Sequence, residues 1–260
     1  MTDFLLYIIT GAGVGFAVGL TGVGGGSLMT PMLLLFGFPT HIAIGTDLIY
    51  AAATKASGVV AHHRQLTVDW TIVGRLAMGS LPASLLTILI LSRIFQDPAE
   101  YRGILLSTLG VMLILTSIVL LMRRRLQQWH ARAAAPSPWL DRNRPGVTVA
   151  AGVFLGVCVT LSSVGAGAFG AAILFLLYPA LSSVRVVGTD LAHAVPLTLI
   201  AGLGHWHLGH IDWMLLGSLL IGSIPAIHFG SRLANQVPER LLQSGLASLL
   251  LLIGVKYAFF

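Results

Sequence analysis

Residues 45–48 read Gly-Thr-Asp-Leu, and the same four letters return at residues 188–191, a shift of 143 positions. The match continues without a gap at this shift: 62 with 205, 69–70 with 212–213, and 79–83 with 222–226. Self-similarity over a fixed distance is the mark of an internally repeated architecture. The chain of 260 residues is therefore predicted to contain two copies of one structural repeat.

The composition indicates that the solvent of this chain is largely lipid. Hydrophobic residues make up 56% of the sequence and charged residues only 9%, and the mean hydropathy is +0.89. A soluble domain has about 25% charged residues. So few polar groups cannot cover a surface in water, which predicts an integral membrane protein. The net charge of +6 is accordingly not interpreted as a nucleic-acid binding signal.

Apolar segments separated by short interruptions predict an all-α, polytopic membrane protein. These segments are 4–20, 28–36, 43–61, 70–91, 103–122, 147–161, 168–177, 187–204, 213–230 and 241–259. Residues 28–36 and 168–177 are too short to cross a bilayer core, which needs about 20 residues. Each follows a stretch of small residues, at 21–27 and at 162–167, that interrupts the preceding helix. We therefore expect one broken helix with a half-helix in each repeat.

The repeats are predicted to be inverted relative to each other. Residues 1–122 form the first transmembrane repeat, residues 123–146 a basic linker, and residues 147–260 the second repeat. Six arginines lie between residues 123 and 144, and the positive-inside rule places such a linker in the cytoplasm. Inverted halves bring most other arginines to the linker side, whereas parallel halves would move Arg185, Arg232 and Arg240 outside.

The two breaks are expected to form an anion site. Equivalent broken helices in two repeats mark the binding sites of transporters, and the free amides at a helix N-terminus favour negative charge. The residues expected to contact the substrate are Gly22, Gly24, Gly25, Gly26, Ser27, Thr46, Lys55, Ser162, Ser163, Gly165, Gly167 and Thr189. The alternative interpretation is that the small residues only pack helices closely together.

Asp47 and Asp190 are carboxylates at equivalent positions of the two repeats. A carboxylate inside a membrane is a candidate to bind a coupling ion or carry a proton. Each also lies near the start of its apolar segment, where an N-cap role is equally open and compatible. Lys55 lies within its segment, where a charge costs about 2.5–3.5 kcal/mol. It could pair with Asp47, contact the substrate, or form only a structural ion pair.

Histidines gather at residues 62–63 and 205–210. A metal site needs converging ligands, and inverted repeats would put these clusters on opposite faces. We therefore interpret them as loop histidines at the membrane interface, with no metal and no cofactor expected. His193, three residues after Asp190, shares its helix face and is a candidate coupling or proton-relay residue. The sequence has no nucleophile elbow, zincin helix or redox pair, so an enzyme is disfavoured.

The glycine-rich break at residues 21–27, the two Gly-Thr-Asp-Leu elements and the two-half layout resemble the TauE/SafE (DUF81) sulfite exporter family. The resemblance covers nearly the whole chain. It implies a permease for sulfur-containing anions such as sulfite, sulfoacetate and related organosulfonates. The residues that match the early break and the Gly-Thr elements are Gly22, Gly24, Thr46 and Thr189. The second break has fewer glycines than the first.

Together these observations predict a secondary transporter that exports small sulfur-containing anions with coupling to protons or another ion. It is expected in the cell inner (plasma) membrane, with lipid and a small anion as partners and no nucleic acid; a homodimer stays open. The alternative is a passive anion channel. A third possibility, an intramembrane enzyme or a metal transporter, would depend on the histidines.

Overall fold

The computed structural model describes residues 2–21, 28–95, 97–132, 138–233 and 239–259, and every regular element in them is a helix. The helices are α1 (Thr2–Thr21), α2 (Met29–Leu35), α3 (Thr40–Arg64), α4 (Trp70–Ile94), α5 (Pro98–Arg132), α6 (Pro138–Ser162), α7 (Ala168–Leu177), α8 (Ser183–His207), α9 (Trp213–Leu233) and α10 (Glu239–Phe259). The half-helices α2 and α7 occur where the sequence predicts them. The all-α fold class and the broken helix of the second repeat are therefore confirmed, whereas residues 22–27 of the first break lie outside the described residues.

Length, composition and surface all identify a membrane protein. Among the described residues, five helical stretches are long and apolar enough to cross a bilayer, and they lie in α4, α5, α6, α8 and α9. Large apolar side chains also point outward. Leu85 and Leu86 of α4 are more than half exposed, and so are Ile221 and Ile224 of α9. Lipid is the solvent in which such a surface is stable.

The predicted linker at residues 123–146 is largely helical, because α5 and α6 both extend into it beyond their apolar segments. Helix α5 continues to Arg132, and α6 begins at Pro138, so only residues 133–137 fall between them, outside the described part. Arginine, leucine and glutamine are good helix formers, and a helix can continue beyond the apolar core of the bilayer. Proline is favoured in the first turn of a helix, where no amide donor is needed.

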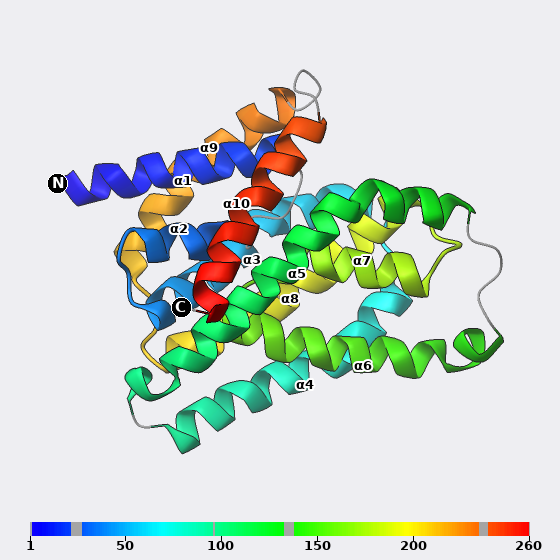
Figure 1. The fold of residues 1–260 in the computed structure, drawn as a ribbon, viewed down its shortest axis with the longest axis horizontal. Coiled ribbons are helices and arrows are strands. Elements are labelled where there is room, and N and C mark those ends of the chain that lie inside the picture. The colour runs from blue at the N-terminus through cyan, green and yellow to red at the C-terminus, as the bar shows by residue number, and fades with distance from the viewer. Residues whose placement is uncertain (1, 22–27, 96, 133–137, 234–238, 260) are drawn as a thin grey trace.

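Helices of the two halves pair with each other. Helix α1 packs along α9, and its equivalent α6 packs along α4; α3 packs along α8, and α5 along α10 (Figure 1). Equivalent helices thus make equivalent contacts, as two-fold pseudosymmetry requires. In the view of Figure 1, α1 and α6 run in opposite directions. Inversion of the repeats across a bilayer stays a prediction, which these directions support.

Glycines at equivalent positions let the paired helices touch backbone to backbone. A Cβ added at Gly79 of α4 would collide with the carbonyl oxygen of Val149 in α6. A Cβ added at Gly222 of α9 would collide with the carbonyl oxygen of Ile8 in α1. Small residues at helix contacts are the usual means by which membrane helices approach closely.

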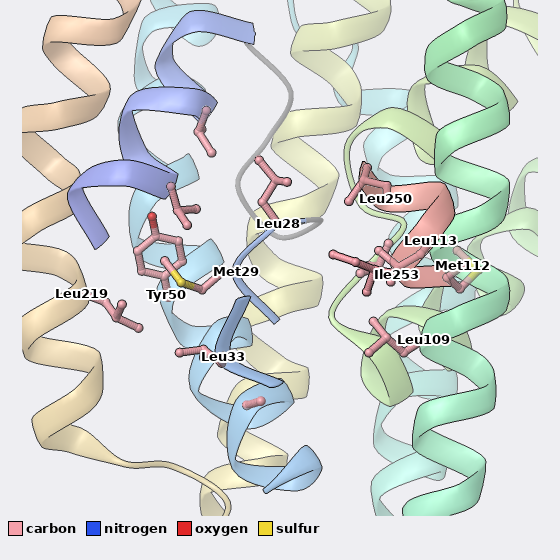
Figure 2. Close-up of a cluster of buried hydrophobic side chains, with 14 of the residues drawn as sticks. Leu28, Met29, Leu33, Tyr50, Leu109, Met112, Leu113, Leu219, Leu250 and Ile253 are labelled. Carbon is pink, nitrogen blue, oxygen red and sulfur yellow. The ribbon is translucent and has the colours of Figure 1, made fainter. Parts of the chain in front are cut away.

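Each half-helix lies within a large buried apolar cluster. Met29 and Leu33 of α2 pack among side chains of α3, α5, α9 and α10, as Figure 2 shows. Leu174 and Phe175 of α7 lie in a second cluster with side chains of α3, α4, α5, α6 and α8. The short helices are therefore enclosed by protein, as a broken helix must be inside a membrane.

Gly79→Ala and Gly222→Ala should each destabilise the fold by about 1–3 kcal/mol, because the added methyl group overpacks a backbone contact. Gly74 and Gly217 lie at equivalent positions on the same two helices and have open space around them. Alanine at either of these control positions should be neutral or stabilising by up to about 1 kcal/mol. Thermal unfolding of the purified variants in detergent measures the difference, and equal stabilities would contradict the observed helix pairing.

Candidate functional site

The second break is a sharply turned segment between α6 and α7. Helix α6 ends at Ser162 and α7 begins at Ala168. Between them Gly165 and Gly167 have φ angles of 119° and 136°, which side-chain-bearing residues rarely adopt. Ser163 also has a positive φ, of 58°. No side chain caps the first turn of α7. Residues 22–27, which contain the first break, lie outside the described residues.

Lys55 reaches the second break from the other half of the protein. Its Nζ donates a hydrogen bond of 2.8 Å to the carbonyl oxygen of Ala166, and only 4% of the residue is exposed. Residues 55 and 166 are far apart in the sequence, and the contact depends on the packing of the two repeats. The mid-segment lysine and the second break are thus one site.

The carboxyl groups of Asp47 and Asp190 are both buried, and both interact electrostatically with Lys55. Asp47 accepts hydrogen bonds from the backbone amide, at 3.1 Å, and the hydroxyl of Thr30 in α2. Asp190 lies against α7, where a Cβ at Gly170 would collide with its Oδ1. Each aspartate therefore contacts the half-helix of its own repeat.

The expected N-cap role of these aspartates is wrong. Helix α3 begins at Thr40, seven residues before Asp47, and α8 begins at Ser183 behind the cap residue Ser182. Both helices start earlier than hydropathy predicts, because polar residues occupy their first turns. Asp47 and Asp190 therefore lie inside their helices, whereas an N-cap residue lies at the start of one.

Thr46 and Thr189 form a reciprocal pair of contacts. The hydroxyl of Thr189 accepts a bond of 2.9 Å from the amide of Asp69, which precedes α4. The hydroxyl of Thr46 accepts a bond of 3.2 Å from the amide of Asp212, which precedes α9. Each threonine thus fixes the start of a helix in the opposite repeat. Their expected contact with substrate stays a prediction.

Several buried polar atoms around this site have no hydrogen-bond partner among the described residues. They are Asp47 Oδ1, Tyr50 OH, Ser163 Oγ, Asp190 Oδ1, His193 Nδ1 and Ser223 Oγ. Ser163 faces Asp47, and Tyr50 faces Ser223 and Asp47. Since more than 90% of buried polar groups in proteins are paired, such a concentration is typical of a site that binds a polar ligand, water or ions.

The two serines of the second break have different surroundings. Ser162 Oγ donates to the carbonyl of Cys158, at 2.6 Å, and accepts from the amide of Val164, at 3.2 Å. Both hydrogen bonds of the Ser162 hydroxyl therefore stabilise the C-terminal end of α6. Ser163, which faces Asp47, is the serine available to a ligand.

His193 lies beside the lysine site, and its Nε2 is 2.8 Å from Ser80 Oγ of α4. Ser80 and its repeat equivalent Ser223 belong to the recurring residues 79–83 and 222–226, but the sequence alone indicates no role for them. Thr30 and Tyr50 are also missed. The recurrence of Gly-Ser-x-Pro-Ala is the one signal that could have indicated the two serines.

The interpretation of the histidines as interface residues holds in part. His63 and His207 are exposed, but His205 and His210 are buried. His205 faces the interior of the helix bundle, and the turn after α8 folds back to bring His210 against it, at 3.0 Å between the two Nδ1 atoms. In the described part of the chain, no three His, Cys, Asp or Glu side chains converge as a metal site would require.

Two open pockets lie near the ends of the helices. One, of about 350 Å³, is lined by Asp69, Arg75, Arg144 and Tyr178 among others. The other, of about 250 Å³, is lined by His41, Asp97 and Arg102 among others. Neither pocket is lined by Lys55, Asp47 or Asp190.

Broken helices with a buried ionisable cluster at the break define a class of multi-pass membrane proteins, the transporters. The family described as "Sulfite exporter TauE/SafE" matches residues 7–257, and the chain belongs to this family. This confirms the resemblance drawn from the sequence motifs.

Curated relatives carry transporter names. "Probable membrane transporter protein YjnA" of Bacillus subtilis (strain 168) is 38% identical over 252 residues, which cover 96% of this chain and 97% of the relative. "Probable membrane transporter protein YunE" of the same organism is 41% identical over 256 residues, with 92% and 90% covered. A similarly named protein of Methanocaldococcus jannaschii, MJ0441, is 25% identical over 268 residues, with 96% and 93% covered. No solved structure matches this chain.

Lys55→Met should lower the free energy of unfolding by about 3–5 kcal/mol, because two buried carboxyl groups lose their shared counter-charge. Adding Asp190→Asn to this variant should recover about 0.5–3 kcal/mol. Adding Asp69→Asn instead, at a partly exposed residue that pairs with Arg185, should recover nothing. Denaturant titration in detergent measures all three variants. A double variant as unstable as Lys55→Met alone would show that Lys55 and Asp190 are not coupled.

Proposed function

We propose that this chain is a secondary transporter that exports small sulfur-containing anions, such as sulfite or organosulfonates, and moves protons with them. The observation that carries the proposal is the position of Lys55, which contacts the second break and interacts electrostatically with one carboxyl group from each repeat. The family name supports the substrate class.

The charges at this site supply the coupling. With both carboxyl groups ionised, one lysine leaves a single negative charge in excess, and an uncompensated charge inside a membrane is costly. A proton on one carboxyl group makes the empty site neutral. When a monovalent anion approaches Lys55, the site stays neutral only if the second carboxyl group also takes a proton. Anion and proton therefore bind together, and a high internal anion concentration drives both outward.

The polar atoms without partners are the groups that would contact the substrate. Ser163 Oγ and Tyr50 OH can donate to an oxyanion, and Lys55 supplies the positive charge. The first break, with Gly22, Gly24, Gly25, Gly26 and Ser27, lies outside the described residues, and its contact with the substrate stays part of the proposal. Gly165 and Gly167 allow the backbone to approach the anion, because no side chain stands in the way.

The distribution of charge supports the proposed orientation in the membrane. Arg75 and Arg144 line the larger pocket, and Arg185 lies at the same end of the bundle, where it pairs with Asp69. Under the positive-inside rule this end faces the cytoplasm of the inner membrane. We propose that this pocket is the entrance for anions leaving the cell.

A passive anion channel remains the second candidate function, and a flux assay separates the two. Purified protein in liposomes should show saturable uptake that an opposing gradient of unlabelled anion accelerates and a pH gradient drives. A binding series with sulfite, sulfoacetate, thiosulfate, sulfate and chloride identifies the substrate class. Flux at channel rates that ignores the pH gradient would favour the channel, and failure of every sulfur anion to bind would remove the proposed substrate.

Lys55→Gln should weaken anion binding by about ten- to a hundredfold, because a charge-assisted hydrogen bond contributes about 1.5–3 kcal/mol. Lys256→Gln, at an exposed lysine of α10, is the matched control and should bind like the wild type. Titration of labelled sulfite or sulfoacetate into protein in detergent measures both affinities. Equal affinities in the two variants would exclude Lys55 from the binding site.

A further inference from the structure

Buried polar groups form a row between α4, α6 and α8 that leads from the α8–α9 turn towards the Lys55 site. The members of this polar row are His210, His205, Thr160, Ser84, Ser80 and His193. All six residues are between 0% and 3% exposed. His205 and His193 are twelve residues apart on α8, which corresponds to about 18 Å along a helix.

The hydrogen bonds at the outer end of the polar row fix the tautomers of two neutral rings. His205 Nε2 lies 2.9 Å from the carbonyl oxygen of Thr160, and a carbonyl can only accept, so this nitrogen carries the proton. His205 Nδ1 must then accept from His210 Nδ1, at 3.0 Å. His210 Nε2 in turn accepts from the hydroxyl of Tyr101, at 2.9 Å. Donors and acceptors therefore alternate from the Tyr101 hydroxyl to the carbonyl of Thr160.

The outer end of the polar row adjoins an open pocket. The ring of His41 lies 4.8 Å from the ring of His210, and His41 lines the 250 Å³ pocket together with Asp97 and Arg102. The groups that face His210 are thus His205 of α8, His41 of α3 and Tyr101 of α5, with Asp97 beyond His41. Burial, followed by the nearby His205, lowers the pKa of His210 to about 3, so the ring is neutral at physiological pH.

The inner end of the polar row reaches the lysine site. Thr160 Oγ1 lies 2.7 Å from Ser84 Oγ and 2.7 Å from the carbonyl oxygen of Gly156. Ser80 lies one helical turn from Ser84 on α4. Ser80 Oγ is 2.8 Å from His193 Nε2. His193 follows Asp190 by three residues on α8 and interacts electrostatically with Lys55. Steps longer than a hydrogen bond, such as that from Ser84 to Ser80, can be bridged by water.

The first repeat shows what the turn needs for its own stability. His62 and Thr67 are the repeat equivalents of His205 and His210, and His62 Nδ1 lies 2.8 Å from Thr67 Oγ1. The Thr67 hydroxyl also donates back to the carbonyl of His62, at 3.0 Å, and the connection ends there. A threonine therefore suffices to hold this turn, and the imidazole of His210 adds the contacts with Tyr101 and His41.

We propose that the polar row conducts the coupling proton between the His41–Asp97 pocket and the carboxyl group of Asp190. Tyr101 passes its hydroxyl proton to His210 Nε2 and regains one from the pocket side, and His210 then releases its Nδ1 proton to His205 Nδ1. His205 then releases its Nε2 proton, which passes by way of water and the hydroxyls of Ser84 and Ser80 to His193, beside Asp190. Each ring gains one proton and loses another, so it stays neutral and changes to its other tautomer. The inference rests on the proposed proton-coupled transport.

His210→Thr tests the polar row with a residue that the first repeat already uses at this place. In liposomes, exchange of labelled for unlabelled anion requires no net proton movement and should stay within about twofold of the wild type. Uptake driven by a pH gradient, with the internal pH followed by a dye, should fall about tenfold or more, as loss of a proton-transfer group does elsewhere. His207→Thr, at an exposed histidine of the same helix end, should leave both rates unchanged.

Tyr101→Phe provides a second test that keeps the packing and removes only the hydroxyl donor. It should lower the pH-driven rate selectively. If His210→Thr keeps full pH-driven uptake, or loses exchange and pH-driven uptake equally, the polar row is not the proton pathway. If the wild type exchanges anions but a pH gradient never drives them, the proton coupling of the proposed function fails, and the pathway fails with it.

Discussion

A peptide group without a hydrogen-bond partner costs several kcal/mol in lipid, so an interrupted helix inside a membrane must be enclosed by protein. Helices α2 and α7 are the interrupted elements here, and each lies within its own apolar cluster. At the second break the carbonyl of Ala166 is satisfied by Lys55, a charge that lipid would not tolerate alone. Enclosing the backbone thus brings the ionisable groups together.

The helix contacts follow a two-fold pseudosymmetry closely, whereas the ionisable residues of the two repeats differ. The threonines that fix the starts of α4 and α9 are exchanged between the halves in the same way, and so are the glycine contacts. Lys55, however, has Thr198 as its repeat equivalent, and His210 has Thr67. One half therefore supplies the positive charge and the other supplies the imidazole pair. A duplicated fold can acquire directional chemistry when single positions diverge in this manner.

Hydropathy and the repeat predicted most of the fold, because they depend on local composition. The number, kind and order of the helices follow from apolar segments, and the second break follows from its glycines. Helix ends were underestimated, since residues such as Arg123 and Arg125 leave the apolar segment but still favour a helix.

The site was only partly predictable from sequence. Lys55, Asp47 and Asp190 were found because a charge in an apolar segment is rare. The contact of Lys55 with Ala166 and the burial of His205 depend on packing between repeats, which local sequence does not encode. Tyr50 and Ser223 are ordinary residues of an apolar helix until their neighbours are known. Tertiary contacts, rather than residue type, decide which polar groups take part.

The pairing of α1 with α9 has a consequence for biosynthesis. The partner of α1 begins at Trp213, so roughly 190 residues must be made before the two helices can meet. At ribosomal rates of about 5–20 residues per second, this interval is roughly 10–40 s. During that time the face of α1 that contains Ile8, which Gly222 of α9 contacts in the folded protein, has no native partner in the nascent chain. Lipid or an insertion factor has to shield it until the second half leaves the ribosome.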